Sequence, residues 1–175
     1  TQLYRLLESS PQSSPSCLKA VLLGGSYIPD TLIEKALARG LPIYKSYGMT
    51  EMGSQINTTT PGETDFSHSG KPLKNVNLKI SDDGEILVKG PSLFQGYLVD
   101  DTIQLRLDQD GYFKTGDIGY LTSDGNLVVT GRKDRMFISG GENIHPEEIE
   151  NEILKIDGII SCNVVPEKDK EFGYC

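Results

Sequence analysis

The sequence predicts an α/β unit, then a β-barrel-like part, then the opening of a further domain. Three observations predict this order. A strand, a helix and a strand follow one another early in the chain, short alternating runs fill the middle, and a Pro-started acidic helix comes near the end. We therefore expect the chain to divide into 1–60, 61–133 and 134–175.

The α/β unit is predicted from its apolar spacing and its breakers. Leucines at 2–8 have helical spacing, and a polar connector follows at 9–16. A buried-strand pattern at 18–23 ends at a double glycine. The pattern at 29–39 predicts an amphipathic helix that proline opens and glycine stops, and a short strand at 42–44 completes a parallel strand–helix–strand unit.

The middle third alternates with period two, which is typical of half-buried strands. Asp83-Gly84 and Asp124-Gly125 stand between such runs, as hairpin turns require. We expect an antiparallel part that forms a small distorted barrel. Its expected strands are 76–80, 85–89, 112–115 and 127–130.

The last part is predicted to begin at a junction. At 131–150 a basic cluster leads through a strand-like segment into a double glycine, and Pro146 then suits the first turn of a helix. We expect this helix at 146–156, with isoleucines along one face, and a strand at 159–165. A strand with nothing after it buries little, so the sequence predicts the opening of a domain.

Composition excludes several classes of protein. The 175 residues are 37% hydrophobic and 24% charged, which is typical of a soluble globular chain. The formal net charge of −8 argues against a nucleic-acid binder, which needs a basic face. No apolar run approaches the roughly 20 residues of a membrane span, and no secretory signal pattern opens the chain. Three widely spaced cysteines make no metal or disulfide pattern, so we expect a cytoplasmic protein.

The most specific candidate site is the segment at 44–51, where an aromatic ring, a glycine, a hydroxyl and a carboxylate come close together. Tyr47 can offer a ring face to a flat base, and Gly48 allows close approach. Thr50 can bond a phosphate oxygen, and Glu51 can hold a hard cation such as Mg²⁺. A loop with a capping Thr-Glu pair explains the same residues equally well.

Two further candidates are less specific by themselves. Gly24, Gly25 and Ser26 follow a predicted strand, where ligands bind in open α/β sheets, although a plain turn is the more frequent reason for this pattern. Asp117 follows a Thr-Gly pair. An aspartate there is usually a turn residue, but its carboxylate can also accept both hydroxyls of a ribose.

Together, the motifs at 22–29, 44–51, 115–117 and 131–150 resemble those of the adenylate-forming enzymes, the superfamily of acyl-CoA synthetases and other AMP-binding enzymes. The resemblance covers essentially the whole chain. It implies the C-terminal portion of the large domain of such an enzyme, followed by the start of its small α+β domain.

The resemblance also implies a role for each candidate residue. Thr50 and Glu51 would be catalytic, with Glu51 as the Mg²⁺ ligand. Asp134 would be the hinge on which the small domain rotates, although a solvated charge run is the plain alternative. Gly140 and Gly141 would line the channel for CoA. The residues that would bind the nucleotide are Gly24, Gly25, Ser26, Tyr47, Gly48, Thr50, Asp117 and Arg132.

Within the superfamily, the segments at 46–56, 70–73 and 169–173 resemble the o-succinylbenzoate–CoA ligases of menaquinone biosynthesis. This implies a ligase that activates a carboxylate with ATP and Mg²⁺, releases AMP, and transfers the acyl group to CoA. Ser26-Tyr27 departs from the small-residue-plus-proline pattern common at this place, which leaves the shape of the acyl pocket open.

Several alternatives remain. Other aryl- or fatty-acyl-CoA ligases and adenylation domains share much of the pattern, and a non-catalytic β-rich binding module is the competing class. The phosphate-binding loop and the C-terminal catalytic lysine of the superfamily have no counterpart here. We therefore expect an internal part of a longer ligase, inactive alone, and leave open whether that ligase forms a homo-oligomer.

Overall fold

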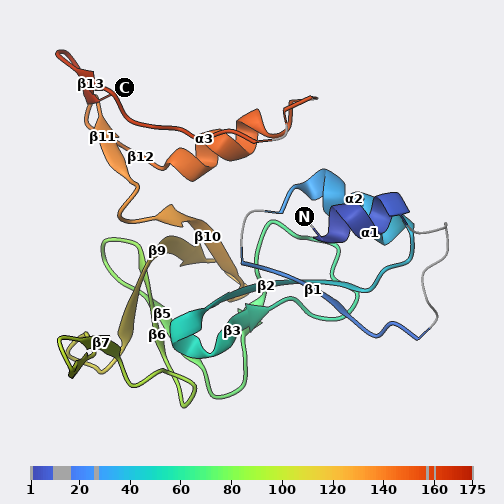
Figure 1. Ribbon diagram of the computed structural model, residues 1–175, viewed down its shortest axis with the longest axis horizontal. Helices are drawn as coiled ribbons and strands as arrows, with labels where there is room; N and C mark the ends of the chain where they lie inside the picture. The colour runs from blue at the N-terminus through green and yellow to red at the C-terminus, as the bar shows by residue number, and fades with distance from the viewer. Residues whose placement is uncertain (1, 10–16, 26–27, 157, 160, 175) are drawn as a thin grey trace.

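Two four-stranded sheets form the body of the chain, and Figure 1 shows the C-terminal elements, in orange and red, along one side of them. The connector predicted at 9–16 lies outside the described residues from residue 10 onwards, as do Ser26 and Tyr27. No helix in the described part of the chain is long and apolar enough to cross a membrane. The computed structural model describes residues 2–9, 17–25, 28–156, 158–159 and 161–174.

The first sheet has the order β1-β2-β3-β4, and two helices pack on it. β1 and β2 are parallel, as the strand–helix–strand pattern predicts, and the helices predicted at 2–8 and 29–39 are confirmed. β1 is shorter than predicted, because only three of its residues pair with β2. The elements of this part are α1 (Gln2–Ser9), β1 (Val21–Leu23), α2 (Asp30–Ala38), β2 (Ile43–Met49), η1 (Thr50–Met52), β3 (Ser54–Thr58) and β4 (Lys71–Pro72).

β2 is longer than the sequence predicts, because it continues from Ile43 through Tyr47 and Gly48 to Met49. The second half of β2 pairs with β3, and Met49 lies opposite Ser54. At Gly48 the two strands approach so closely that a Cβ would lie 1.7 Å from the Ser54 carbonyl oxygen. Only glycine fits there, and the tyrosine and the glycine of the candidate site therefore lie on a paired strand rather than in a loop.

The second sheet is antiparallel and has the order β10-β9-β6-β5. The antiparallel middle part and both predicted hairpin turns are confirmed. β9 runs past residue 115 because its second half pairs with β10. Register shifts between β6 and β9 and between β9 and β10 curl the sheet. Its strands are β5 (Asn77–Ile80), β6 (Glu85–Lys89), β9 (Phe113–Leu121) and β10 (Leu127–Arg132).

A second core joins the two sheets. Met52 and Ile56, from η1 and β3, pack in one cluster with Ile86, Phe113 and Leu127 of the second sheet. Between β6 and β9 the chain forms the exposed hairpin of β7 (Tyr97–Val99) and β8 (Thr102–Gln104). The division of the chain at residues 60 and 133 stays a prediction, although β4 extends the first sheet past residue 60.

The C-terminal segment, residues 134–174, contains small elements with little apolar packing. Gly140 and Gly141 both have positive φ, 58° and 92°, and form the turn of a hairpin. α3 begins at Pro146, as predicted, but ends at Ile153. Its predicted apolar face is not buried, since Ile149 is exposed. The elements here are β11 (Phe137–Ser139), β12 (Glu142–Ile144), α3 (Pro146–Ile153), β13 (Lys168–Asp169) and β14 (Gly173–Tyr174).

The strand predicted at 159–165 is wrong, since the described residues of this stretch belong to no strand. Glu150 of α3 holds the stretch instead. The Val164 amide donates to its Oε1 at 2.8 Å, and the Cys162 thiol donates to its carbonyl oxygen at 3.3 Å. A β-branched run forms a strand only where a neighbouring strand accepts and donates the backbone hydrogen bonds.

Candidate active site

A cleft opens where the two sheets meet. Three adjoining cavities of about 700, 800 and 400 Å³ form it, and Gly48 borders all of them. Residues from both sheets and from the segment between them line these cavities, and α3 contributes to the third one. The predicted site residues brought together here are Gly24, Gly25, Tyr47, Gly48, Thr50, Glu51, Asp117 and Arg132.

A chain of hydrogen bonds crosses the cleft through Asp117. The Tyr47 hydroxyl donates to Asp117 Oδ2 at 2.6 Å, and the Arg132 guanidinium donates to Asp117 Oδ1 at 3.1 Å. Burial raises the pKa of Tyr47, and the negative charge of Asp117 raises it further, so the phenol stays a donor at neutral pH. Each carboxylate oxygen keeps a second lone pair. Asp117 can therefore still accept two hydroxyl groups.

The register of β9 and β10 explains why Asp117 and Arg132 meet. The two residues are directly opposite partners across this antiparallel pair. Opposite residues in a hairpin have Cβ atoms roughly 4.5–5.5 Å apart, which suits an ion pair. Arg132 also donates to the Thr115 carbonyl oxygen at 3.2 Å. The arginine is therefore held by the same short motif, Thr115-Gly116-Asp117, that supplies its carboxylate partner.

Thr50 and Glu51 also line the 800 Å³ cavity, and they lie in the short η1 helix directly after β2. The Tyr97 hydroxyl, on β7, donates a hydrogen bond to Glu51 Oε1. That hydrogen bond raises the pKa of Tyr97, because ionising the phenol would place two negative oxygens together. The sequence did not single out Tyr97, and no local pattern connects it to a carboxylate 46 residues away.

Glu51 is a single carboxylate, and the described residues hold no cluster of three or more His, Cys, Asp or Glu side chains able to bind a metal. Mg²⁺ usually takes one or two carboxylates together with substrate phosphates and several waters. The residues of the cleft therefore fit a magnesium ion that arrives with a nucleotide. They do not fit a metal bound by protein ligands alone.

A second residue that sequence reasoning missed is Glu85, a buried carboxylate at the start of β6. The Gly116 amide donates to its Oε1 at 3.0 Å, and Lys133 Nζ lies 2.8 Å from its Oε2. Lys133 also pairs with Asp83 at 2.7 Å. These partners raise the pKa of Lys133 to about 12, and the lysine lowers the pKa of Asp83 to about 2. Glu85 thus connects the β9 backbone next to Asp117 to the junction.

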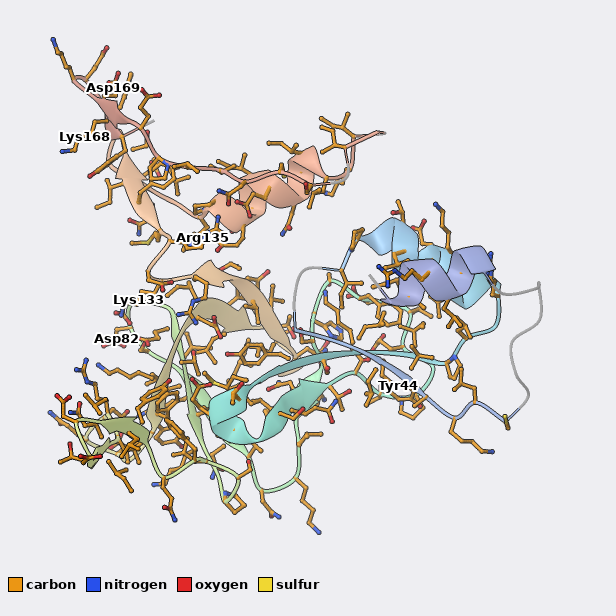
Figure 2. The ribbon with its side chains drawn as sticks, in the orientation of Figure 1. Tyr44, Asp82, Lys133, Arg135, Lys168 and Asp169 are labelled. Atoms are coloured by element: carbon orange, nitrogen blue, oxygen red, sulfur yellow. The ribbon has the colours of Figure 1, made fainter. Side chains whose placement is uncertain are left out.

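Asp134 lies beside the cleft and is bound to it through Arg132. The guanidinium donates to Asp134 Oδ1 at 3.1 Å and to Oδ2 at 3.3 Å. This contact lowers the pKa of Asp134, although its side chain is 69% exposed. Figure 2 shows the neighbouring Lys133 and Arg135 on the segment between β10 and β11. The candidate hinge and the candidate ribose ligand therefore share one arginine.

Some predicted site residues do not meet at the cleft. Gly140 and Gly141 line none of its three cavities. Gly140 instead packs against Phe172, whose carbonyl oxygen accepts its amide at 3.0 Å. Ser26 lies outside the described residues. The candidate CoA residues are therefore apart from the candidate nucleotide residues in this conformation.

A cleft at strand ends that combines glycines, a hydroxyl, carboxylates and an arginine is typical of an enzyme that binds a nucleotide. The family model described as "AMP-binding enzyme" matches residues 1–98. The chain belongs to this family, which confirms the superfamily resemblance and the predicted fold class.

The chain is similar to named enzymes over nearly its whole length. The 2-succinylbenzoate–CoA ligase of Listeria monocytogenes serotype 4b (strain F2365) is 42% identical over 175 residues, which are 99% of this chain and 38% of that protein. An o-succinylbenzoate CoA synthetase from Bacillus subtilis, solved with the acyl-adenylate intermediate OSB-AMP, is 37% identical with a TM-score of 0.89, covering 98% of this chain and 38% of that one. The same enzyme, solved with ATP and a magnesium ion, is 37% identical with a TM-score of 0.87. The match covers 97% of this chain and 38% of that one. The chain thus spans about 38% of the length of these relatives.

Proposed function

We propose that this chain is part of an AMP-forming acid–CoA ligase that converts o-succinylbenzoate into its CoA thioester. The convergence of Tyr47, Thr50, Glu51, Asp117 and Arg132 on one cleft supports this proposal most directly. The relatives named for this activity support the choice of acid, because their similarity covers nearly the whole chain.

The third cavity is the proposed site of the nucleoside. Its wall combines the Tyr47 ring, which would face the adenine, with the Asp117 carboxylate, which would accept the ribose hydroxyls. Arg132 would hold that carboxylate in place and contribute its own donors. Gly24, Gly25 and Gly48 would let the backbone approach the ligand, and Ser26 is proposed to act beside them.

The second cavity is the proposed site of the reacting phosphate. The Thr50 hydroxyl would donate to an α-phosphate oxygen, and Glu51 would hold the magnesium ion that neutralises the departing pyrophosphate. A substrate carboxylate would attack the α-phosphorus to give an acyl-adenylate, and the CoA thiol would then displace AMP. The chain's contribution to both steps is positioning and charge stabilisation.

Asp134 is the proposed hinge between these steps. Its exposed side chain and its few packing partners allow the change in φ and ψ that a rotation needs. Gly140 and Gly141 would reach CoA after the rotation, which agrees with their distance from the cleft here. We also propose the division into an α/β unit at 1–60, a β subdomain at 61–133 and the start of a mobile domain at 134–175. A cytoplasmic location of the longer enzyme stays a prediction, and its oligomeric state stays open.

Pyrophosphate release tests the proposed activity. The longer enzyme should release pyrophosphate with o-succinylbenzoate at least about 10-fold faster than with benzoate, fatty acids or amino acids, a discrimination of about 1.4 kcal/mol. The 175-residue chain alone should release none that depends on a carboxylate. A different preferred acid would show that the enzyme is another acid–CoA ligase of the family. Carboxylate-dependent turnover by the chain alone would show that its own residues suffice for adenylation.

The competing proposal, a non-catalytic β-rich module, needs no convergence of the four motifs. It predicts a chain that binds no nucleotide. Isothermal titration of the longer protein with AMP separates the two proposals. A non-catalytic module should give no saturable heat, and the Asp117→Ala variant should then behave like the unmodified protein.

A further inference from the structure

The hairpin of β7 and β8 is attached to the catalytic candidate Glu51 at two points. The Phe94 amide, just before β7, donates to the Glu51 carbonyl oxygen at 2.8 Å. The Tyr97 hydroxyl donates to Glu51 Oε1. One contact holds the backbone of the residue and the other holds its carboxylate, so the hairpin restrains both the position and the rotamer of Glu51.

The Tyr97 ring is itself well supported. It packs edge-on against Phe94 with ring centroids 4.8 Å apart, and Phe94 packs in the same way against Phe113 of the buried core at 5.5 Å. Tyr97 is itself 51% exposed, and the large side chains of Leu98 and Ile103 in the hairpin are more exposed and lack its ring contact. The contact between the hairpin and the cleft therefore depends on the Phe94–Tyr97 pair.

The surroundings of Glu51 show why a restraint matters. Arg106 and Arg132 line the same cavity. A carboxylate that rotated freely would be attracted to either guanidinium, since charge-assisted pairs are among the stronger polar contacts. The Tyr97 hydroxyl occupies Oε1 with a neutral donor, which leaves the negative charge uncompensated and Oε2 available.

We propose that Tyr97 is a positioning residue that holds the Glu51 carboxylate in the orientation needed to ligate the magnesium ion of the nucleotide. This inference rests on the proposed role of Glu51 in metal binding. Carboxylates that ligate metals are commonly hydrogen-bonded by an outer partner, and removing such a partner typically weakens metal binding or activity by roughly 10- to 100-fold.

The test is Tyr97→Phe in the longer enzyme, which keeps the ring contact with Phe94 and removes only the hydroxyl. The Mg²⁺ concentration for half-maximal adenylation should rise about 10-fold, while the rate at saturating Mg²⁺ changes less than about 3-fold. A second measurement needs no turnover. Electron paramagnetic resonance can monitor Mn²⁺ binding in the presence of a non-hydrolysable ATP analogue, and the affinity for Mn²⁺ should also fall about 10-fold. Tyr120→Phe is the matched control, because Tyr120 is exposed and lines none of the three cavities.

Glu51→Gln, measured in parallel, separates this inference from the proposed function. If Glu51→Gln raises the Mg²⁺ requirement and Tyr97→Phe does not, the role of Tyr97 is overturned and the role of Glu51 stands. If neither variant changes the requirement, Glu51 is no metal ligand, and both proposals fail at this residue. If Tyr97→Phe lowers the melting temperature and the saturated rate but leaves Mn²⁺ binding unchanged, Tyr97 is only a packing residue.

Discussion

The walls of the cleft and the C-terminal segment are stabilised in different ways. Apart from Pro146, the buried aliphatic and aromatic side chains that the structure describes lie at or before Leu127, in the two cores beneath the sheets that form the cleft. The C-terminal segment is held mainly by polar pairs around Arg135, which contacts Glu147 at 2.9 Å, Glu150 at 2.6 Å and Asn163 at 3.1 Å.

This difference indicates which part can move. A buried core keeps its side chains within narrow positions, as a binding site requires. Partly exposed ion pairs contribute little net stability, roughly 0–1 kcal/mol each where solvent screens them. The packing around the cleft therefore suits a fixed part, and the mainly polar contacts of the segment after Asp134 agree with its proposed rotation.

The largest expected effect compares one isoleucine from each region. Ile86→Ala, at a fully buried position, should lower the free energy of unfolding by about 2–5 kcal/mol, because it leaves a cavity in the core between the sheets. Ile156→Ala, at a position 58% exposed, should change it by less than about 0.5 kcal/mol. Urea unfolding measures both. Equal losses would show that the C-terminal segment has a core of its own.

Asp117→Ala should weaken both half-reactions of the longer enzyme by roughly 5- to 150-fold, or about 1–3 kcal/mol. The variant removes the acceptor of Tyr47 and Arg132 and of the proposed ribose contact, which is needed throughout the reaction. ATP–pyrophosphate exchange and thioester formation measure the two steps separately. Glu34→Ala, at an exposed position on α2, is the control and should change neither. An effect of Asp117→Ala on one step alone would contradict a ribose ligand.

Asp134→Pro should impair the two half-reactions unequally, by a ratio of about 10-fold or more. The Arg135 amide donates to the Arg132 carbonyl oxygen at 3.2 Å, which closes a turn with Asp134 at its third position. Proline fixes φ near −65° and is disfavoured at that position of the commonest turn. A fixed φ should therefore restrict the chain to one domain pose, so that one half-reaction survives while the other falls steeply. Asp134→Ala removes the arginine contact without fixing φ and serves as the comparison.

If Asp134→Pro instead reduces adenylation and thioester formation equally, as a general folding defect would, the junction is an ordinary turn. The contrast between a fixed cleft and a mobile segment would then have no functional meaning.

The smallest effect concerns the border between the two regions. Lys133 lowers the pKa of Asp83 from 3.8 to about 2. Because the folded-state value is the lower one, the pair stabilises the fold above about pH 4, and this contribution disappears as the pH falls to about 2. The Asp83 side chain is 60% exposed, so solvent screening limits the effect to less than about 1 kcal/mol.

Urea unfolding between pH 5 and pH 2 measures this contribution. The Asp83→Asn variant should lose less stability over that range than the unmodified chain, and the difference should shrink in high salt. A variant with the same pH dependence as the unmodified chain would show that Lys133 is held by Glu85 alone.

Local patterns predicted the elements that depend on neighbouring residues. The strand at 85–89 is confirmed to the residue, because the Asp83-Gly84 turn fixes where it begins, although four successive residues are buried rather than every second one. α2 follows from its apolar stripe and from the glycine that ends it. The strand at 159–165 failed for the opposite reason: its residues favour a strand, but Glu150 rather than a neighbouring strand holds the backbone.

The residues of the candidate site also fall into those that local patterns predict and those that only distant contacts bring in. The pattern at 44–51 and the Thr-Gly-Asp motif identified Tyr47, Thr50, Glu51 and Asp117, because short motifs place particular chemical groups at fixed spacing. Neither pattern indicated that Tyr97 would reach Glu51. That contact joins residues 46 positions apart, and no local rule specifies it.

The sequence by itself determined the family, the order of the elements and the chemical groups that would face a nucleotide. These depend on residue types and short spacings. Only the tertiary structure decided which groups touch: that Arg132 binds Asp117 and Asp134 together, that Glu85 connects the junction to the second sheet, and that the two glycines at 140–141 lie away from the cleft. Such contacts depend on how distant segments approach one another, and burial and strand register set that approach.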